Sequence, residues 1–149
     1  MRLQISTSLA LYSTLEFAAR SGQAISAADI ASKYRVSTHH LAKVLRELVR
    51  AGILESTRGV GGGYRFGGSA KRLTLMDVIE LFEDIGAGRN RTPGASTDVG
   101  RGLGVVLAEI DEIAKATFRS ITVETMLKLI ERQRSEEKPR PAPRKARRA

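Results

Sequence analysis

Polar and basic side chains gather at the start of one predicted helix, and these residues are the best placed in the sequence to do chemistry. Hydroxyl, imidazole, ammonium and guanidinium groups supply hydrogen-bond partners for base edges in the major groove of DNA. The N-terminus of a helix also attracts phosphate. The sequence therefore predicts a DNA contact at this helix start. The cluster consists of Ser37, Thr38, His39, His40, Lys43 and Arg46.

The two histidines could instead bind a metal or act as a general base. Adjacent residues on a helix point about 100° apart, and neither His39 nor His40 has a third ligand nearby in the sequence. The acidic cluster Glu109-Asp111-Glu112 is typical of a solvated helix face. Because no paired carboxylates and no Ser/His/Asp set stand out, we predict no catalytic residues, no metal site and no cofactor, and therefore no enzyme.

The sequence contains no cysteine, and its absence excludes every site that needs a thiol. A disulfide framework, a thiol nucleophile and thiolate-bound zinc are all excluded. An iron–sulfur cluster held by thiolates is excluded for the same reason.

The composition favours a polyanionic partner. The 149 residues suit one domain, or one small domain plus an arm, and 25 basic against 16 acidic residues give a net charge of +9. Such a balance is typical of proteins that bind nucleic acid or an anionic membrane. No apolar run reaches the roughly 20 residues that cross a bilayer, and the N-terminus lacks the apolar core of a signal peptide. We predict a cytoplasmic protein that does not associate with a membrane.

Helix start signals place the polar cluster in a helix-turn-helix. The same six-residue pattern begins at Ile25 and again at Val36. It consists of an apolar residue, a Ser or Thr, two further residues, a polar residue and an apolar residue. The pattern predicts a helix over about 27–33, a turn at 34–36 and a second helix over about 38–51. The apolar positions of the second helix are Leu41, Val44, Leu45, Leu48 and Val49.

A glycine-rich hairpin follows. Strands are predicted over 53–57 and 64–66, joined by the loop 58–63, which lacks the Gly-Lys-Ser/Thr ending of a nucleotide phosphate loop. Its glycines remove side chains where backbone amides would approach a phosphate or the groove floor. Helix-turn-helix plus basic hairpin is the layout of a winged helix. The wing residues expected to touch DNA are Arg58, Gly59, Val60, Gly61 and Arg65.

The second half of the chain is predicted to be helical. We expect a helix over about 74–85, a loop at 86–102, an amphipathic helix over about 103–117 and a last helix over about 123–134. The stripe on the long helix indicates a dimer interface, with an intramolecular core as the alternative. This stripe is formed by Leu103, Val106, Leu107, Ile110, Ile113 and Ala114.

These elements predict a mostly α fold with a small β-wing, that is, a winged helix-turn-helix plus a long C-terminal dimerisation helix. Residues 1–72 form the DNA-binding domain. Residues 73–134 hold the connecting helix, the sensor-type loop at 86–102 and the dimerisation helices. Residues 135–149, with three prolines and no large apolar residue, form a disordered basic tail.

Several segments resemble the Rrf2 family of bacterial transcriptional regulators, over about residues 1 to 134. The wing motif Arg-Gly-x-Gly-Gly-Gly-Tyr is the most specific of them. Members of this family include an iron–sulfur cluster regulator, a nitric-oxide-sensing repressor and a cysteine-metabolism repressor. The matching segments are Met1 to Leu3, Ala10-Leu11, Ala31, Leu41 to Leu48, Ala51 to Leu54, Arg58 to Tyr64 and Leu75 to Val78.

The resemblance implies a homodimer that binds a palindromic operator in double-stranded DNA and usually represses transcription. It assigns Ser37, Thr38, His39, His40 and Lys43 to the start of the recognition helix. It also assigns the loop 58–61 to a wing that enters the minor groove.

The sensor region departs from the family pattern. Cluster-binding members carry three cysteines between the helix ending near Ile85 and the dimer helix, where this sequence has none. Ser8 stands where some nitric-oxide sensors place an acidic ligand. We therefore expect a cluster-free regulator whose effector is a small molecule or a protein partner. Two other functions remain open, namely a winged helix that binds a partner protein and an RNA-associated basic protein.

Deleting residues 138–149 is expected to weaken DNA binding without changing the preferred site. This segment carries six basic residues and no acidic one, and contacts between cations and phosphates release counterions whatever the sequence. The slope of log affinity against log salt, measured by fluorescence anisotropy, should become less steep in the deletion. A slope equal to that of the full chain would contradict the role of the tail.

Overall fold

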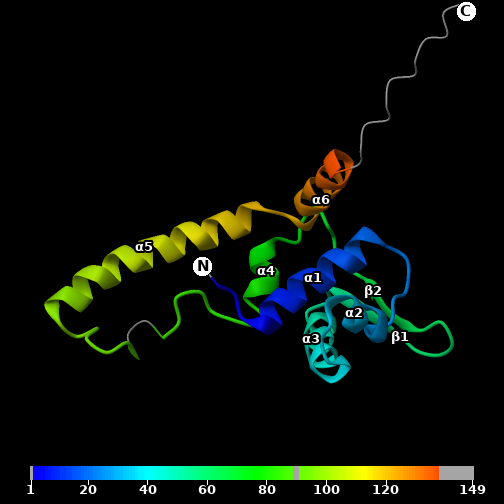
Figure 1. Ribbon diagram of the computed structural model, residues 1–149, viewed down its shortest axis with the longest axis horizontal. Helices are drawn as coiled ribbons and strands as arrows, with labels where there is room; N and C mark the ends of the chain where they lie inside the picture. The colour runs from blue at the N-terminus through cyan, green and yellow to red at the C-terminus, as the bar shows by residue number, and fades with distance from the viewer. Residues whose placement is uncertain (1, 89–90, 138–149) are drawn as a thin grey trace, which may run out of the picture.

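The computed structural model describes residues 2–88 and 91–137 and is mostly helical, with one small hairpin (Figure 1). The predicted tail at 138–149 lies outside the described residues. In chain order the elements are α1 (Ile5–Ala19), α2 (Ala27–Tyr34), α3 (Thr38–Arg50), β1 (Leu54–Thr57), β2 (Gly63–Phe66), α4 (Leu75–Ile79), α5 (Asp98–Ser120) and α6 (Val123–Glu137).

The predicted helix-turn-helix is confirmed as α2 and α3. The Ser26 hydroxyl caps α2 by accepting a hydrogen bond from the Asp29 amide at 3.1 Å, and the Ser37 hydroxyl caps α3 by accepting from the His40 amide at 3.0 Å. α1 lies across both helices, and the apolar faces of the three close one core. The largest fully buried side chains in this core are Phe17, Ile30, Leu41, Leu45, Leu48 and Leu54.

The wing is an antiparallel hairpin that is fixed at its base to the segment before α2. β1 and β2 pair with Leu54 opposite Phe66 and Thr57 opposite Gly63. The amide of Ile25 donates to the Tyr64 carbonyl, and the amide of Tyr64 donates back to the Ile25 carbonyl, both at 2.9 Å. A Cβ on Gly63 would lie 2.5 Å from the Ile25 carbonyl oxygen, so this approach requires glycine.

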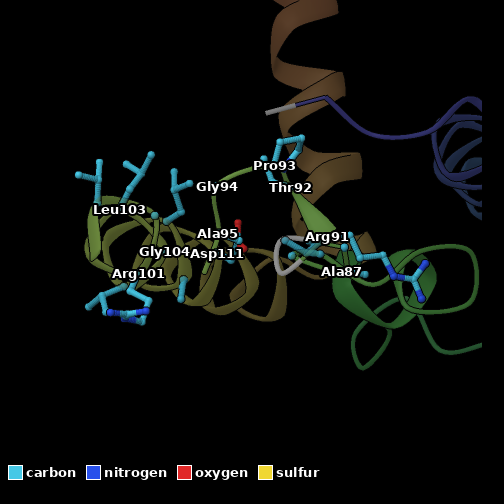
Figure 2. A pocket seen from close by; sticks show the side chains of 18 of the residues that line it. Ala87, Arg91, Thr92, Pro93, Gly94, Ala95, Arg101, Leu103, Gly104 and Asp111 are labelled. Atoms are coloured by element: carbon cyan, nitrogen blue, oxygen red, sulfur yellow. The ribbon is translucent and has the colours of Figure 1, made fainter. Parts of the chain in front are cut away.

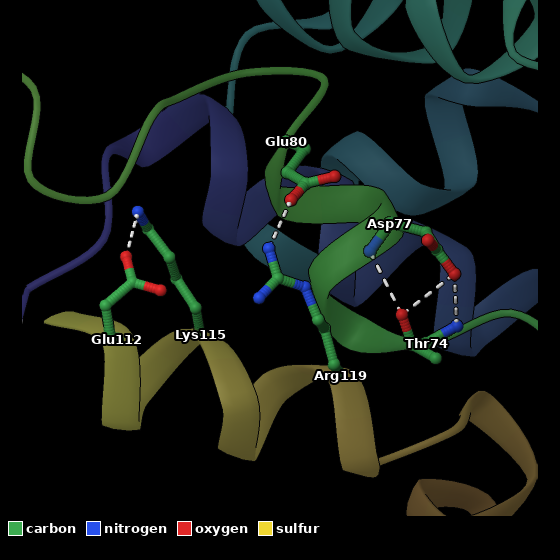
Figure 3. A network of polar contacts seen from close by, with 6 residues as sticks. All are labelled: Thr74, Asp77, Glu80, Glu112, Lys115 and Arg119. Carbon is green, nitrogen blue, oxygen red and sulfur yellow. Dashed lines mark hydrogen bonds and ion pairs between the residues drawn. The ribbon is translucent and has the colours of Figure 1, made fainter.

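α4 connects the winged helix to the second half of the chain (Figure 3). The Thr74 hydroxyl accepts from the Asp77 amide at 3.2 Å, and the Asp77 carboxylate accepts from the Thr74 amide at 2.8 Å, which completes a capping box. Arg119 of α5 donates to Glu80 at 3.4 Å. A second, smaller core forms around Met76, Ile79 and Ile85, with Phe118 of α5 packed against it.

Two boundaries in this region were predicted wrongly. α4 ends at Ile79, whereas the sequence predicted a helix to about 85. The amides of Leu81 and Phe82 donate to carbonyls three residues back, so the chain tightens into turns, in which Leu81 is exposed and Ile85 is buried. α5 begins at Asp98, inside the loop predicted for 86–102, because the Thr97 hydroxyl accepts from the Gly100 amide and caps an earlier start.

α5 and α6 are both longer than predicted. α5 extends away from the rest of the molecule, contains no buried residue and continues to Ser120 (Figure 1). α6 continues to Glu137, so residues 135–137, which were predicted to begin the disordered tail, are helical. Among the described residues, no helix combines the length and the apolar character needed to cross a bilayer.

Candidate nucleic-acid interface

The exposed face of α3 carries the predicted DNA contacts. Positions 39, 43, 46 and 50 are spaced by four, three and four residues, which places them on one side of a helix. All four of these side chains are exposed, whereas the opposite face of α3 is buried in the core. The first turn of α3 contains no acidic residue. Its N-terminal amides therefore present positive potential without local neutralisation.

Ion pairing decides which of these cations are available to DNA. Arg50 donates to Glu47 at 3.2 Å, so part of its charge is compensated within α3. Lys43 and Arg46 form no ion pair within the described part of the chain. These two side chains can contact phosphate without first breaking an internal contact.

The two histidines occupy different environments. His39 is exposed on the same face as Lys43, next to the exposed Thr38 and Ser37. His40 is half-buried, and its Nε2 atom is buried without a hydrogen-bond partner among the described residues. In this conformation the Nε2 atom of His40 is not accessible to a ligand, whereas the His39 side chain is exposed.

The wing tip is exposed and small. Val60 is fully exposed between Gly59 and Gly61, whose φ angles are +96° and +74°. Only glycine adopts such angles readily, so these two glycines produce the narrow turn. The Thr57 hydroxyl accepts from the Gly63 amide at 3.1 Å and closes the base of the loop.

The two predicted wing arginines differ. Arg65 lies opposite Glu55 in the hairpin and forms an ion pair with it at 2.7 Å. Arg58 is exposed and forms no ion pair with any described residue. The free charge on the wing is therefore at Arg58, at the end of β1.

Four exposed cations of residues 2–80 without an ion pair among the described residues were not predicted as DNA contacts, namely Arg2, Arg35, Lys71 and Arg72. Charge alone does not show which side chains pair with an acid, and pairing across space has no local signal in the sequence. The exposed Arg and Lys side chains of residues 2–80 without an ion pair among the described residues are Arg2, Arg35, Lys43, Arg46, Arg58, Lys71 and Arg72.

A second feature is the apolar stripe on α5. The predicted residues Leu103, Val106, Ile110 and Ile113 are each more than half exposed. Leu107 is also exposed, and Ala114 is half-buried. Within the described part of the chain α5 has no buried residue, so no intramolecular core covers this stripe there.

A cavity of about 1110 Å³ lies between residues 84–88 and 91–97 on one side and the N-terminal half of α5 on the other (Figure 2). Its wall contains Leu103, Pro93 and the cations Arg91 and Arg101. Arg101 forms an ion pair with Asp98, whereas Arg91 forms none with a described residue. The described residues contain no group of three His, Cys, Asp or Glu side chains that could hold a metal ion.

Comparison with known proteins identifies relatives over most of the chain. Residues 3–129 match the model of the Rrf2 family, which is described as iron-dependent transcriptional regulators. The protein named HTH-type transcriptional regulator BadM, from Rhodopseudomonas palustris, is 52% identical over 134 residues, which cover 90% of this chain and 86% of BadM. The HTH-type transcriptional regulator NsrR of Bacillus licheniformis is 38% identical over 64 residues, 43% of this chain and 45% of NsrR.

Two solved structures have the same fold. CymR, the global cysteine regulator of B. subtilis, has a TM-score of 0.72 at 24% identity, over 87% of this chain and 98% of CymR. T. potens IscR has a TM-score of 0.73 at 20% identity, over 95% of this chain and 94% of IscR. These likenesses confirm the predicted winged-helix class.

The ion-pair pattern predicts that Lys43→Ala weakens DNA binding roughly tenfold, because a free ammonium on the exposed face of α3 is lost. The salt dependence of affinity should also become less steep. Lys128→Ala, which removes an exposed α6 cation already paired with Glu124, is the matched control and should bind like the parent. Anisotropy titrations at several salt concentrations, with circular dichroism to check folding, measure both effects. Equal affinities for the two variants would exclude α3 as the contacting helix.

Proposed function

The chain belongs to the Rrf2 family of transcriptional regulators, and we propose that it binds a palindromic operator as a homodimer and represses transcription there without an iron–sulfur cluster. The observation that carries this proposal is the unpartnered apolar stripe of α5 beside a winged helix with free cations.

The stripe has the spacing of a coiled-coil seam. Val99, Leu103, Val106, Ile110 and Ile113 follow one another at intervals of four, three, four and three residues. Intervals that alternate between three and four residues place these side chains along one face of the helix. Such an apolar face packs against the same face of a second helix. A contiguous exposed apolar surface of this kind is unfavourable in water unless a partner covers it. A second copy of the chain offers the same seam and is the occupant that we propose.

A two-fold dimer accounts for the form of the operator. Two copies of α3 related by two-fold symmetry match two inverted half-sites. We assign base contacts to Thr38 and His39, and phosphate contacts to Lys43, Arg46 and Arg58. These side chains are exposed, and the three cations form no ion pair with a described residue.

The thiolate chemistry of an iron–sulfur cluster does not fit this chain, although the family is described as iron-dependent. The sequence has no cysteine, and the described residues offer no alternative group of three metal ligands. We therefore assign regulation to a small molecule or a protein partner. The cavity that residues 84–88 and 91–97 form with α5 is the proposed effector site, because it adjoins the proposed dimer seam at Leu103.

Repression is proposed from family membership, since a dimer bound across a promoter would exclude other proteins from the same DNA. The family is one of transcriptional regulators, which points away from an enzyme.

Placing a charge in the seam is expected to separate the protomers. Ile110→Lys should convert the dimer to a monomer at micromolar concentration, because two ammonium groups would face each other in an apolar interface. Val105→Lys is the matched control, since Val105 is an exposed apolar residue of α5 that lies off the seam. Analytical ultracentrifugation measures the oligomeric state of each variant.

The same pair of variants tests the link between dimerisation and DNA binding. Ile110→Lys should lose about a hundredfold or more in affinity for a two-half-site duplex, because the second α3 is no longer tethered to the first. Val105→Lys should bind like the parent. A parent chain that sediments as a monomer, or an Ile110→Lys dimer, would contradict the proposed interface.

A further inference from the structure

The turn between α2 and α3 contains an unusual backbone conformation. Arg35 has φ +53° and ψ +46°, the left-handed region, and it is the single non-glycine with positive φ among the described residues. Elsewhere in the winged helix the chain uses glycine for such positions, for example Gly52, which follows Ala51, the C-cap of α3. An L-amino acid with a Cβ is disfavoured in this region, whereas glycine is not.

The hydrogen bonds at the end of α2 require this conformation. The Arg35 amide donates to the Ser32 carbonyl at 3.3 Å, and the Val36 amide donates to the Ala31 carbonyl at 3.0 Å. This pattern closes the helix end and reverses the chain within two residues. The reversal brings Ser37 into position to cap α3. Glycine would satisfy the backbone at this position, so the local fold does not explain why an arginine occupies it.

The arginine side chain gains no compensating contact within the protein. It is exposed and forms no ion pair or hydrogen bond with any described residue. Its neighbours differ, because the Lys33 ammonium forms an ion pair with Glu16 and the Tyr34 hydroxyl donates to the same carboxylate at 2.6 Å. Residues that hold a disfavoured backbone conformation without a stabilising contact of their side chain are typical of functional positions.

The surroundings of Arg35 indicate an anionic ligand. Arg35 precedes the N-cap of α3 by two residues, and the first turn of α3 has no acidic side chain. The free cations Lys43 and Arg46 follow on α3. A guanidinium beside a helix N-terminus suits a phosphate, because both donate hydrogen bonds to its oxygens.

We infer that Arg35 is a DNA-binding residue that contacts a backbone phosphate beside the start of α3. The left-handed turn fixes the Arg35 backbone two residues before the N-cap of α3 in the absence of DNA. The contact is to phosphate, so it contributes affinity and register without sequence preference. This inference rests on the proposed DNA-binding function and adds a residue that neither charge nor spacing in the sequence distinguishes.

The test is a substitution whose effects on folding and on binding have different signs. Arg35→Gly removes the charge and places the preferred residue in the left-handed turn, so its melting temperature should equal or exceed that of the parent. Its affinity for a mixed-sequence DNA duplex should fall roughly fivefold to tenfold, with a less steep salt slope. Arg35→Asn, which also tolerates this conformation, should behave like Arg35→Gly, and Arg35→Lys should keep most of the slope.

Matched measurements separate the outcomes. Arg134→Ala removes an exposed α6 cation without an ion pair in the described chain and should bind like the parent. A parent-like affinity and slope for Arg35→Gly and Arg35→Asn would overturn the phosphate contact. A lower melting temperature in both variants would also overturn it, because the side chain would then act within the protein. A parent chain that does not prefer a captured promoter fragment over scrambled DNA would instead refute the proposed function.

Discussion

Burial of one face of α3 is the constraint on which the rest of the interface depends. Leu41, Val44, Leu45 and Leu48 are each 2% exposed or less, and they close the core between α1, α2 and β1. Because a helix repeats every 3.6 residues, burying this face leaves the polar stripe of α3 in solvent. The hydrophobic effect thus orients the exposed side chains of α3 that we propose to contact DNA, although none of these exposed side chains belongs to the core.

The second half of the chain presents the opposite situation. α5 is 23 residues long and buries none of them, and Phe118 and the Glu80–Arg119 ion pair hold its C-terminal part to α4. A helix with an exposed apolar seam is stable in water when another surface covers that seam. The winged helix buries its apolar core within one chain, whereas we propose that the apolar seam of α5 is buried between two chains.

Much of the fold could be predicted because its signals are local. The caps at Ser26 and Ser37 depend on a hydroxyl and an amide three residues later, and the wing depends on glycines within one hairpin. The end of α4 and the start of α5 were missed. The apolar residues after Ile79 keep a helical spacing although the chain turns there, and the cap at Thr97 was not recognised in the loop.

The finer features of the site depend on contacts between distant residues or on backbone angles. Arg65 forms an ion pair with Glu55 only because the register of the hairpin places the two residues opposite each other. Likewise, the left-handed φ of Arg35 depends on how α2 ends, and an arginine in a sequence does not predict such an angle. The free cations are therefore a property of the folded chain.

We propose that the chain recognises a specific two-fold DNA sequence as a dimer. Promoter-pool DNA capture by the purified chain at physiological salt, with scrambled DNA as competitor, tests it most directly. We expect enrichment of one dyad-symmetric site, with the two half-sites about one helical turn apart or a multiple of it. Capture of DNA without a shared sequence would contradict specific recognition, because the chain's net positive charge alone would then explain binding.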